Sequence, residues 1–310
     1  MTGYVVGGGK TGYNLYQFFR KNGIDSVILY YFPGEYADRK KVGKSFEAWK
    51  GMKNHDENSM IIITSETAFN QLTLEDQKHL PTHYLIRDKE NFEEIASQIG
   101  IHSIPSFTPS NVQYPAALKP KDAMQKKVPF KFKKIKHEKE LERFHDFLND
   151  CILQPFLSEK EYSQIAIAGY FDGNPGSMIA VEQRNHYPKG ISAFVINRTV
   201  EHHDIIGRIS EYLNEIKYNG FIEMELKKHK VSGEFYLMDI NPRPWGWFYY
   251  YLDGIQNFEE FWFQGHPLQI KLKKCWVNFP RLVMANLKGE FSNPSLSDIL
   301  TRNICYEPYF

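Results

Sequence analysis

The sequence lacks closely spaced cysteines, long apolar runs and a net charge, and each absence excludes a class of protein. Its three cysteines, among 310 residues, form no Cys-x-x-Cys pair, which argues against a disulfide framework or a zinc site. No apolar stretch approaches the roughly 18 residues of a membrane helix, and the first residues do not resemble a secretion signal. Since 38 basic residues balance 37 acidic ones, nothing favours binding to nucleic acid or to an anionic membrane. We therefore expect a soluble, cytoplasmic protein.

The glycine-rich start of the chain lacks one residue of the phosphate-binding P-loop. That pattern requires a glycine five residues before Gly9-Lys-Thr, and this position is Tyr4. The dinucleotide pattern does fit, with Gly7, Gly9 and Gly12 between a strand and a helix. However, the acid that should end the second strand is missing, because the first acid, Glu35, lies past a proline. The glycines therefore predict a tight turn, and we expect any ligand there to be an anionic group of the acceptor substrate.

Hydrophobic patterns divide the chain into three regions. The first is predicted to be a small α/β domain, with strands at 4–6, 26–31 and 59–64 and helices at 13–21 and 66–79. The middle region has a helix that ends at Gly100, a strand at 114–120, a basic stretch, a helix at 138–149 and a strand at 151–158. The last has an antiparallel meander that turns at 172–176, a helix at 201–217, and strands at 220–228 and 234–241.

Lysines stand at two informative places in the middle region. Lys119 closes an apolar strand just before a proline, where it either reaches for a charged group or extends to the surface beside apolar residues. Further on, Phe130 and Phe132 alternate with Lys131 and Lys133. A strand with this pattern would present both lysines on one face, which suits a polyphosphate; the alternative is a solvated charged surface.

The strands at 220–228 and 234–241 predict a hairpin with a metal site. If they pair about residue 232, Glu225 lies opposite Asp239 and Glu223 lies opposite Asn241. Two adjacent carboxylates repel unless a cation lies between them or one of them takes a proton. With a cation, an amide oxygen adds a third hard ligand for magnesium. Arg243, between two prolines, is held ready for a phosphate or carboxylate. The alternative is an ordinary charged hairpin.

From about Asp88 to Trp247 these motifs, in this order, resemble those of the ATP-grasp superfamily, in its biotin carboxylase and carbamoyl-phosphate synthase branch. "DINPRPWG" and "MEL" are similar to the family's two metal-binding strands, and "YPAALKP" is similar to its phosphate-binding strand. "ILQPFLS" resembles the hinge that reads adenine, and "EQRNHYP" resembles the basic segment that contacts phosphate or substrate.

The resemblance implies a set of site residues. The metal ligands would be Glu225, Asp239 and Asn241, and the catalytic arginines would be Arg243 and Arg184. The nucleotide-binding residues would be Lys89, Lys119, Lys131 or Lys133, Gln154, Pro155, Phe156, Leu157, and Glu159 or Glu161. The bound species would be ATP with Mg²⁺, or Mn²⁺ as an alternative.

The implied architecture is a Rossmann-like α/β domain followed by a two-lobed α+β ATP-grasp fold. Its domains would be 1–88, a small lid subdomain at 89–154, and a C-terminal lobe with the metal site at 155–310. The sequence departs from the family pattern, because no glycine occurs from 120 to 136, where a glycine-rich lid loop is usual. Asp239 also replaces the commoner glutamate.

The resemblance implies a ligase that activates a small-molecule carboxylate as an acyl phosphate and couples it to an amine. A small-molecule kinase on the same fold and a non-catalytic nucleotide-binding protein are the alternatives, and a homodimer is left open. The aromatic residues 245–251, which follow the hairpin, either line an acceptor pocket or belong to the core.

Overall fold

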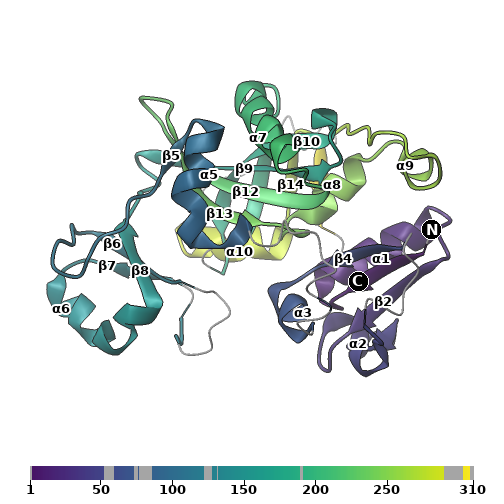
Figure 1. Cartoon of the computed structure of the whole chain (residues 1–310), viewed down its shortest axis with the longest axis horizontal. Helices are drawn as coiled ribbons and strands as arrows, with labels where there is room; N and C mark the ends of the chain where they lie inside the picture. Colours follow the sequence, from purple (N-terminus) through teal and green to yellow (C-terminus); the bar gives the residue numbers. More distant parts are fainter. Residues whose placement is uncertain are drawn as a thin grey trace. The chain divides into compact units, whose positions relative to one another are not determined.

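The chain forms two compact units (Figure 1). The computed structural model describes residues 2–51, 59–72, 76, 86–121, 128–130, 132–188, 191–289 and 303–307. The larger unit comprises residues 1–84, 165–224 and 241–310, and the smaller one comprises 85–164 and 225–240. The hairpin at 225–240 thus belongs with the smaller unit, whereas the sequence-based division placed it in the C-terminal domain. No helix among the described residues is both long and apolar enough to cross a membrane.

The N-terminal part of the larger unit is an α/β arrangement with a parallel sheet. Four parallel strands lie in the order β3 (Lys44–Ser45), β2 (Val27–Tyr31), β1 (Gly3–Val6) and β4 (Met60–Ile63). Val5 and Leu29 of this sheet share a buried core with Leu15 and Phe19 of α1 (Lys10–Lys21). The shorter helices are α2 (Tyr36–Arg39), η1 (Phe46–Ala48) and α3 (Glu66–Gln71), and α3 ends earlier than the predicted 66–79.

An eight-stranded sheet follows, in the order β15-β14-β11-β10-β9-β12-β13-β5. Its strands are β5 (His102–Ser103), β9 (Tyr162–Phe171), β10 (Met178–His186), β11 (Ser192–Asn197), β12 (Gly220–His229), β13 (Phe235–Asn241), β14 (Cys275–Val277) and β15 (Ile304–Tyr306). β12 and β13 are the two strands of the predicted hairpin. The boundary between the units crosses both of them.

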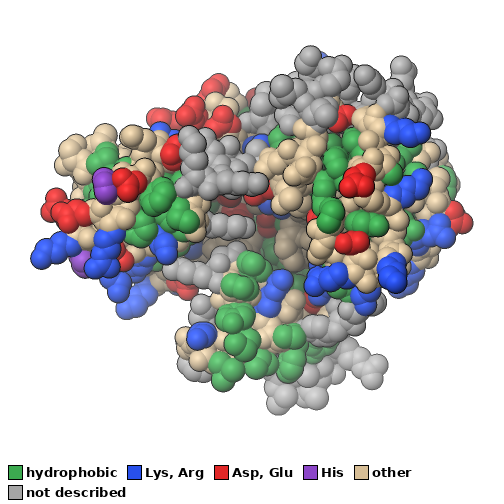
Figure 2. All heavy atoms as spheres, turned by 90° about the horizontal axis from the view of Figure 1, so that it is seen from below, with side chains coloured by type: hydrophobic (Ala, Val, Ile, Leu, Met, Phe, Trp, Pro, Cys, Tyr) green, Lys and Arg blue, Asp and Glu red, His purple; other side chains and the backbone are tan. Residues whose placement is uncertain are grey.

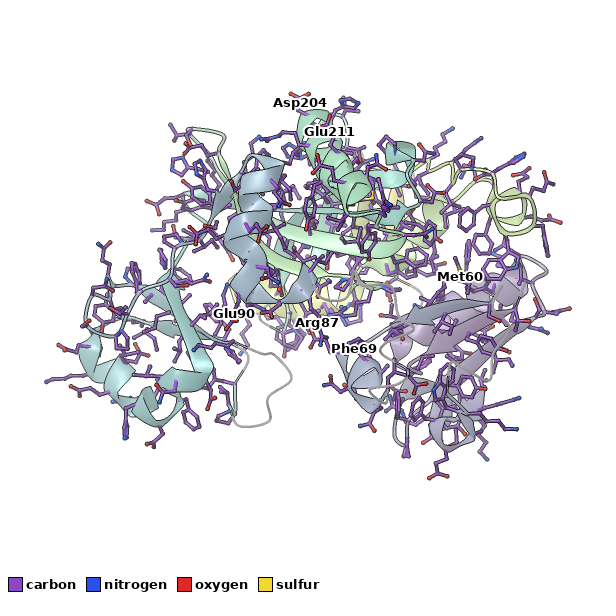
Figure 3. All side chains as sticks on the ribbon, in the orientation of Figure 1. Met60, Phe69, Arg87, Glu90, Asp204 and Glu211 are labelled. Atoms are coloured by element: carbon purple, nitrogen blue, oxygen red, sulfur yellow. The ribbon has the colours of Figure 1, made fainter. Side chains whose placement is uncertain are left out.

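Helices accompany this sheet and bury one face each. α7 (His203–Glu215) buries Ile205, Ile209 and Leu213, while Asp204 and Glu211 point outward in Figure 3. The helical spacing of these residues explains why the sequence predicted the helix. The remaining helices of the larger unit are η6 (Pro175–Ser177), α8 (Phe248–Gly254), α9 (Phe258–Gln264) and α10 (Phe279–Leu287).

The smaller unit contains an antiparallel sheet of three strands in the order β7 (Lys133–Ile135), β6 (Ala116–Pro120) and β8 (Cys151–Pro155). Its helices are η4 (Lys89–Asn91), α5 (Phe92–Ile99), α6 (Glu138–Leu141) and η5 (Glu142–Asp150). α5 ends at Gly100, whose φ of 72° is left-handed, as the glycine predicted. Figure 2 shows lysine and arginine side chains on the surface of the part that carries β6–β8, at the left of the view.

The aromatic residues after the hairpin form core. Trp245, Trp247 and Tyr250 are each 1% exposed, and Tyr251 is fully buried. Trp245 packs against Trp247 with a ring-centroid distance of 5.0 Å, and Tyr251 donates a hydrogen bond to the Ser177 carbonyl. These contacts favour the core interpretation over an acceptor pocket.

The glycine loop is closed by a carboxylate of the chain itself. The backbone N–H groups of Gly8 and Phe32 both donate to Glu35 Oε2, at 2.5 and 2.8 Å. Glu35 is the acid that lies past the proline after β2, so it binds the loop's own amides. Gly12 supports the turn in another way, because a Cβ there would lie 1.9 Å from the Gly7 carbonyl oxygen.

Glu307 ties the C-terminal strand to the N-terminal domain. It is 6% exposed, accepts a hydrogen bond from Trp276 Nε1 at 3.1 Å, and lies 3.6 Å from Lys10 Nζ. Burial raises the pKa of Glu307 above its ordinary value, while the Lys10 ammonium opposes the rise. Lys10 of the Gly-Lys-Thr sequence therefore pairs with a carboxylate of the chain.

We predict that Gly12→Ala is destabilising and Gly9→Ala is not. At Gly12 the new methyl overlaps backbone, which costs roughly 1–3 kcal/mol of unfolding free energy or more. At Gly9, φ is −61° and the closest atom to a Cβ is 4.0 Å away. We expect a change there within about 0.5 kcal/mol. Urea denaturation measures both, and equal losses in the two variants would contradict the packing role of Gly12.

We also predict that Glu307 makes stability depend on pH. Because its folded-state pKa is raised, the native state binds a proton more tightly than the unfolded chain. Stability from this group is present below its ordinary pKa of 4.5 and is lost as pH rises through the raised value. Glu307→Gln keeps the acceptor for Trp276 and should lose less unfolding free energy over that range than the wild type. Glu211→Gln, on the outward face of α7, is the control; a wild-type-like slope in Glu307→Gln would contradict the assignment.

Candidate functional site

Lys89 contacts the predicted metal strand in the smaller unit. Its Nζ lies 3.2 Å from Asp239 Oδ1, and its side chain is 17% exposed. The local fold explains the contact: α5 leads from η4 into β5, and β5 pairs in parallel with β13, with His102 beside Tyr236. Figure 3 shows Glu90, the neighbour of Lys89, at the start of this segment. Two residues far apart in sequence, both predicted for the site, thus meet.

Lys119 is the centre of the charged groups in this unit. On β6, Leu118 lies opposite Leu153 and packs in the lobe's core, so Lys119 points to the other face of the sheet. Burial lowers the pKa of the Lys119 amine. Asp239 and Glu225 oppose this shift by attraction, while Lys89 and Lys227 add to it by repulsion. The structure therefore brings Lys89, Lys119, Glu225 and Asp239 into one charged group, and their roles stay predictions.

Lys227 is a charged residue of this group that sequence reasoning missed. It lies two residues after Glu225 on β12, so the two side chains share a face of the strand. The residue is only 6% exposed. Burial lowers the pKa of its amine, and attraction to Glu159 and Glu225 opposes the shift. The alternation of "ELK" within a predicted strand was the signal that could have revealed it.

Asn241 is held at the end of β13 in the larger unit. Its Nδ2 donates to Glu223 Oε2 at 3.1 Å, and Glu223 is 4% exposed. This contact agrees with the predicted pairing of these two residues across the hairpin. Gln183 Nε2 on β10 also donates to Glu223, at 3.4 Å. Because the amide nitrogen of Asn241 is engaged, its oxygen is oriented away from Glu223.

Arg243 is fixed by three acceptors. Its Nη2 donates to Asn241 Oδ1 at 3.0 Å and to Glu66 Oε1 at 3.4 Å, and its Nη1 donates to the Pro244 carbonyl at 3.1 Å. Glu66 is the first residue of α3, so the guanidinium joins the N-terminal domain to the end of β13. The rigid presentation expected from the flanking prolines is present.

Arg184 and Gln183 point to opposite faces of β10. Arg184 Nε donates to Glu182 Oε1 at 2.9 Å, and Glu182 also accepts from Arg198 at 3.1 Å. Burial would raise the pKa of Glu182, but hydrogen bonds from both arginines outweigh it and lower the pKa. Successive residues of a strand point to opposite faces, so Gln183, and not Arg184, reaches Glu223. The role of Arg184 stays a prediction.

The predicted adenine hinge follows β8, which ends at Pro155. Gln154 Nε2 donates to the Ile104 carbonyl at 3.1 Å, and the Phe156 N–H donates to the Pro115 carbonyl at 3.1 Å. Leu157 is half-buried beyond this point, and Glu161 Oε2 accepts from Ser158 Oγ at 2.9 Å. The side chain of Gln154 is thus engaged within the chain. The nucleotide contacts of the hinge stay predictions.

The register of β7 separates its lysines. Lys133 lies opposite the core residue Leu118, and its Nζ is 5.8 Å from the centre of the Phe130 ring. Lys134 lies opposite Ala117, on the face that carries Lys119, with its Nζ 3.9 Å from the centre of the Phe156 ring. The strand therefore presents Lys134, and not Lys133, on the Lys119 face. Lys131 lies outside the described residues.

Comparison with known proteins rests on structure alone. No protein-family model matches the sequence, and no curated protein matches it significantly. An N5-carboxyaminoimidazole ribonucleotide synthetase in complex with ADP matches with a TM-score of 0.68 and 16% identity, over 93% of this chain and 85% of that chain. The same enzyme from Thermus thermophilus matches with a TM-score of 0.63 and 17% identity, over 97% and 86% of the two chains.

An L-amino acid ligase from Bacillus licheniformis is also similar, with a TM-score of 0.57 and 16% identity, over 89% of this chain and 78% of that chain. At such identities the likeness concerns the fold. The chain therefore has the ATP-grasp fold that its ordered motifs predicted.

Proposed function

We propose that this protein is an ATP-dependent ligase that activates a small-molecule carboxylate as an acyl phosphate and joins it to an amine, releasing ADP and phosphate. One observation carries the proposal: one lysine, Lys89, and two carboxylates, Glu225 and Asp239, all predicted from separate motifs, gather around Lys119 in the smaller unit. The structural neighbours include synthetases determined with ADP and an amino acid ligase, which supports the same chemistry.

The charged groups suit a magnesium–nucleotide complex. Within the described residues, no cluster of three or more histidine, cysteine or acidic side chains could hold a metal alone. Mg²⁺ bound with a nucleotide commonly uses one or two carboxylates together with phosphate oxygens. Glu225 and Asp239 would provide two such carboxylates, and Asn241, whose Oδ1 accepts from Arg243, stays the proposed third ligand. The residues present therefore fit magnesium, which would neutralise charge on the transferring phosphate.

The chain's own residues would act by positioning and by charge. The Lys89 and Lys119 ammonium groups would bind phosphate oxygens, and the carboxylates beside them would orient both side chains. The substrate carboxylate would attack the γ-phosphorus as the bond to the ADP oxygen breaks. The amine would then attack the acyl carbon and expel phosphate. Arg243, already fixed by Glu66 and Asn241, would hold the acyl phosphate.

The test of this proposal is an ADP-release screen. Pools of amino acids, sugar acids and amines are offered with ATP and magnesium, and the products are identified by mass. We expect ADP release that requires both a carboxylate and an amine, with a product mass equal to their condensation. A phosphorylated final product formed without an amine would instead identify a kinase, and no nucleotide binding at all would exclude both.

We predict that Asp239→Asn abolishes metal-dependent ATP turnover while the protein stays folded. The substitution removes a carboxylate that faces Lys89 and that we assign to the metal, so turnover should fall about 100-fold or more. Asp253→Asn is the matched control, because Asp253 also pairs with a lysine, Lys273, at 3.0 Å. Turnover is measured with the best substrate pair from the screen, and folding is checked by thermal denaturation. Wild-type turnover in Asp239→Asn would remove the metal assignment.

A further inference from the structure

Lys227 is a buried amine that the proposed catalytic groups do not use. Its residue is 6% exposed. Within the described parts of the chain, its ammonium makes no hydrogen bond and no ion pair closer than 4.0 Å. Burying an ammonium group without a direct partner is costly, and such groups are normally paired. No described residue compensates this charge directly, and an anionic ligand bound beside the amine would do so.

The neighbours of Lys227 show where that group would lie. The carboxylates that attract its amine are Glu159 and Glu225. The family resemblance implies Glu159, or Glu161 as the alternative, as the ligand of the ribose and Glu225 as a metal ligand. Repulsion from Lys227 also lowers the pKa of the Lys119 amine, so the two lysines belong to one charged region. Lys227 therefore lies between groups assigned to opposite ends of a nucleotide's sugar–phosphate chain.

The charges of this region leave room for an anion. Lys89, Lys119, Lys227 and Lys230 provide four positive charges, and Glu159, Glu225 and Asp239 provide three negative ones, which leaves one positive charge. The magnesium complex of a nucleoside triphosphate is a net anion, so it complements this excess. Lys227 supplies the charge that makes the difference.

We propose that the Lys227 ammonium binds the α-phosphate of the nucleotide, a contact shared by ATP, ADP and AMP. The inference rests on the proposed function, because it takes the ribose at Glu159 and the metal at Glu225. The α-phosphate is the group that connects the ribose to the metal-bound phosphates. Lys227 is thus assigned as a nucleotide-binding residue that anchors the part of ATP that does not react.

The adjacent residue offers a matched control. Lys228 follows Lys227 on β12 and so points to the opposite face of the strand. Its Nζ lies 5.5 Å from the centre of the Phe235 ring, away from the charged region. Lys227→Met and Lys228→Met remove the same charge from neighbouring positions, and methionine preserves the length of the buried stem.

The experiment titrates the wild type and both variants with ATP, ADP, AMP and adenosine by calorimetry, without magnesium. We expect Lys227→Met to weaken all three phosphorylated ligands by similar factors, about tenfold or more, because it removes one charged hydrogen bond. Adenosine affinity should be unchanged. Lys228→Met should bind all four ligands like the wild type, within about twofold.

Thermal denaturation without ligand separates this role from a structural one. If the amine lacks a partner in the free protein, Lys227→Met should melt at the wild-type temperature or higher. A melting temperature several degrees lower, or failure to fold, would show that Lys227 supports the fold and would overturn the inference. The inference would also be overturned if Lys227→Met lost affinity for adenosine and AMP equally, or if it lost affinity for ATP but not for AMP. If the wild type binds no nucleotide, the proposed function fails; if it binds ATP and Lys227→Met binds equally well, only the inference fails.

Discussion

The burial of lysine amines beside carboxylates is the constraint on which the site of this protein depends. An ammonium group loses hydration when β6 carries Lys119 into the interior, and only nearby negative charge can offset that loss. Asp239 and Glu225 supply part of it, and Lys89, whose Nζ lies 3.2 Å from Asp239 Oδ1, repels the Lys119 amine. The positions of η4, β6, β12 and β13 are therefore coupled through charge as well as through packing. A region with surplus amines is stable only if its remaining charge is exposed or is neutralised by a ligand.

Much of this fold follows from local patterns in the sequence. Gly100 ends α5 because only glycine adopts its left-handed backbone easily, and the hairpin of β12 and β13 follows from two apolar-polar alternations around a glycine turn. Lys119 could be singled out because a lysine that closes an apolar strand either binds a charged group or extends to the surface beside apolar residues. The Lys89–Asp239 contact joins residues 150 positions apart, and it was predictable only through the order of family motifs.

The rest depends on strand register, which one sequence does not fix. Lys133 and Lys134 are neighbouring lysines that the sequence alone does not distinguish. The pairing of β7 with β6 places Lys134 on the face that carries Lys119. A shift by one residue would exchange them, just as it would exchange Arg184 and Gln183 on β10. Glu35 shows another limit of prediction from sequence. It lies beyond the strand end at which the dinucleotide pattern expects an acid. The chain reverses at Gly34, with φ 83°, and this reversal lets the Glu35 carboxylate accept from the Gly8 N–H.

Arg243 connects a helix of the N-terminal domain to the end of β13 through its hydrogen bonds. A guanidinium has five N–H donors, and Glu66, Asn241 and the Pro244 carbonyl engage three, so two remain for a substrate. Glu66 also offsets its charge, which weakens Arg243 as a bare cation and strengthens it as an oriented donor pair. Because Glu66 begins a helix of the N-terminal domain, the orientation of the two remaining donors depends on the position of that helix as well as on Asn241.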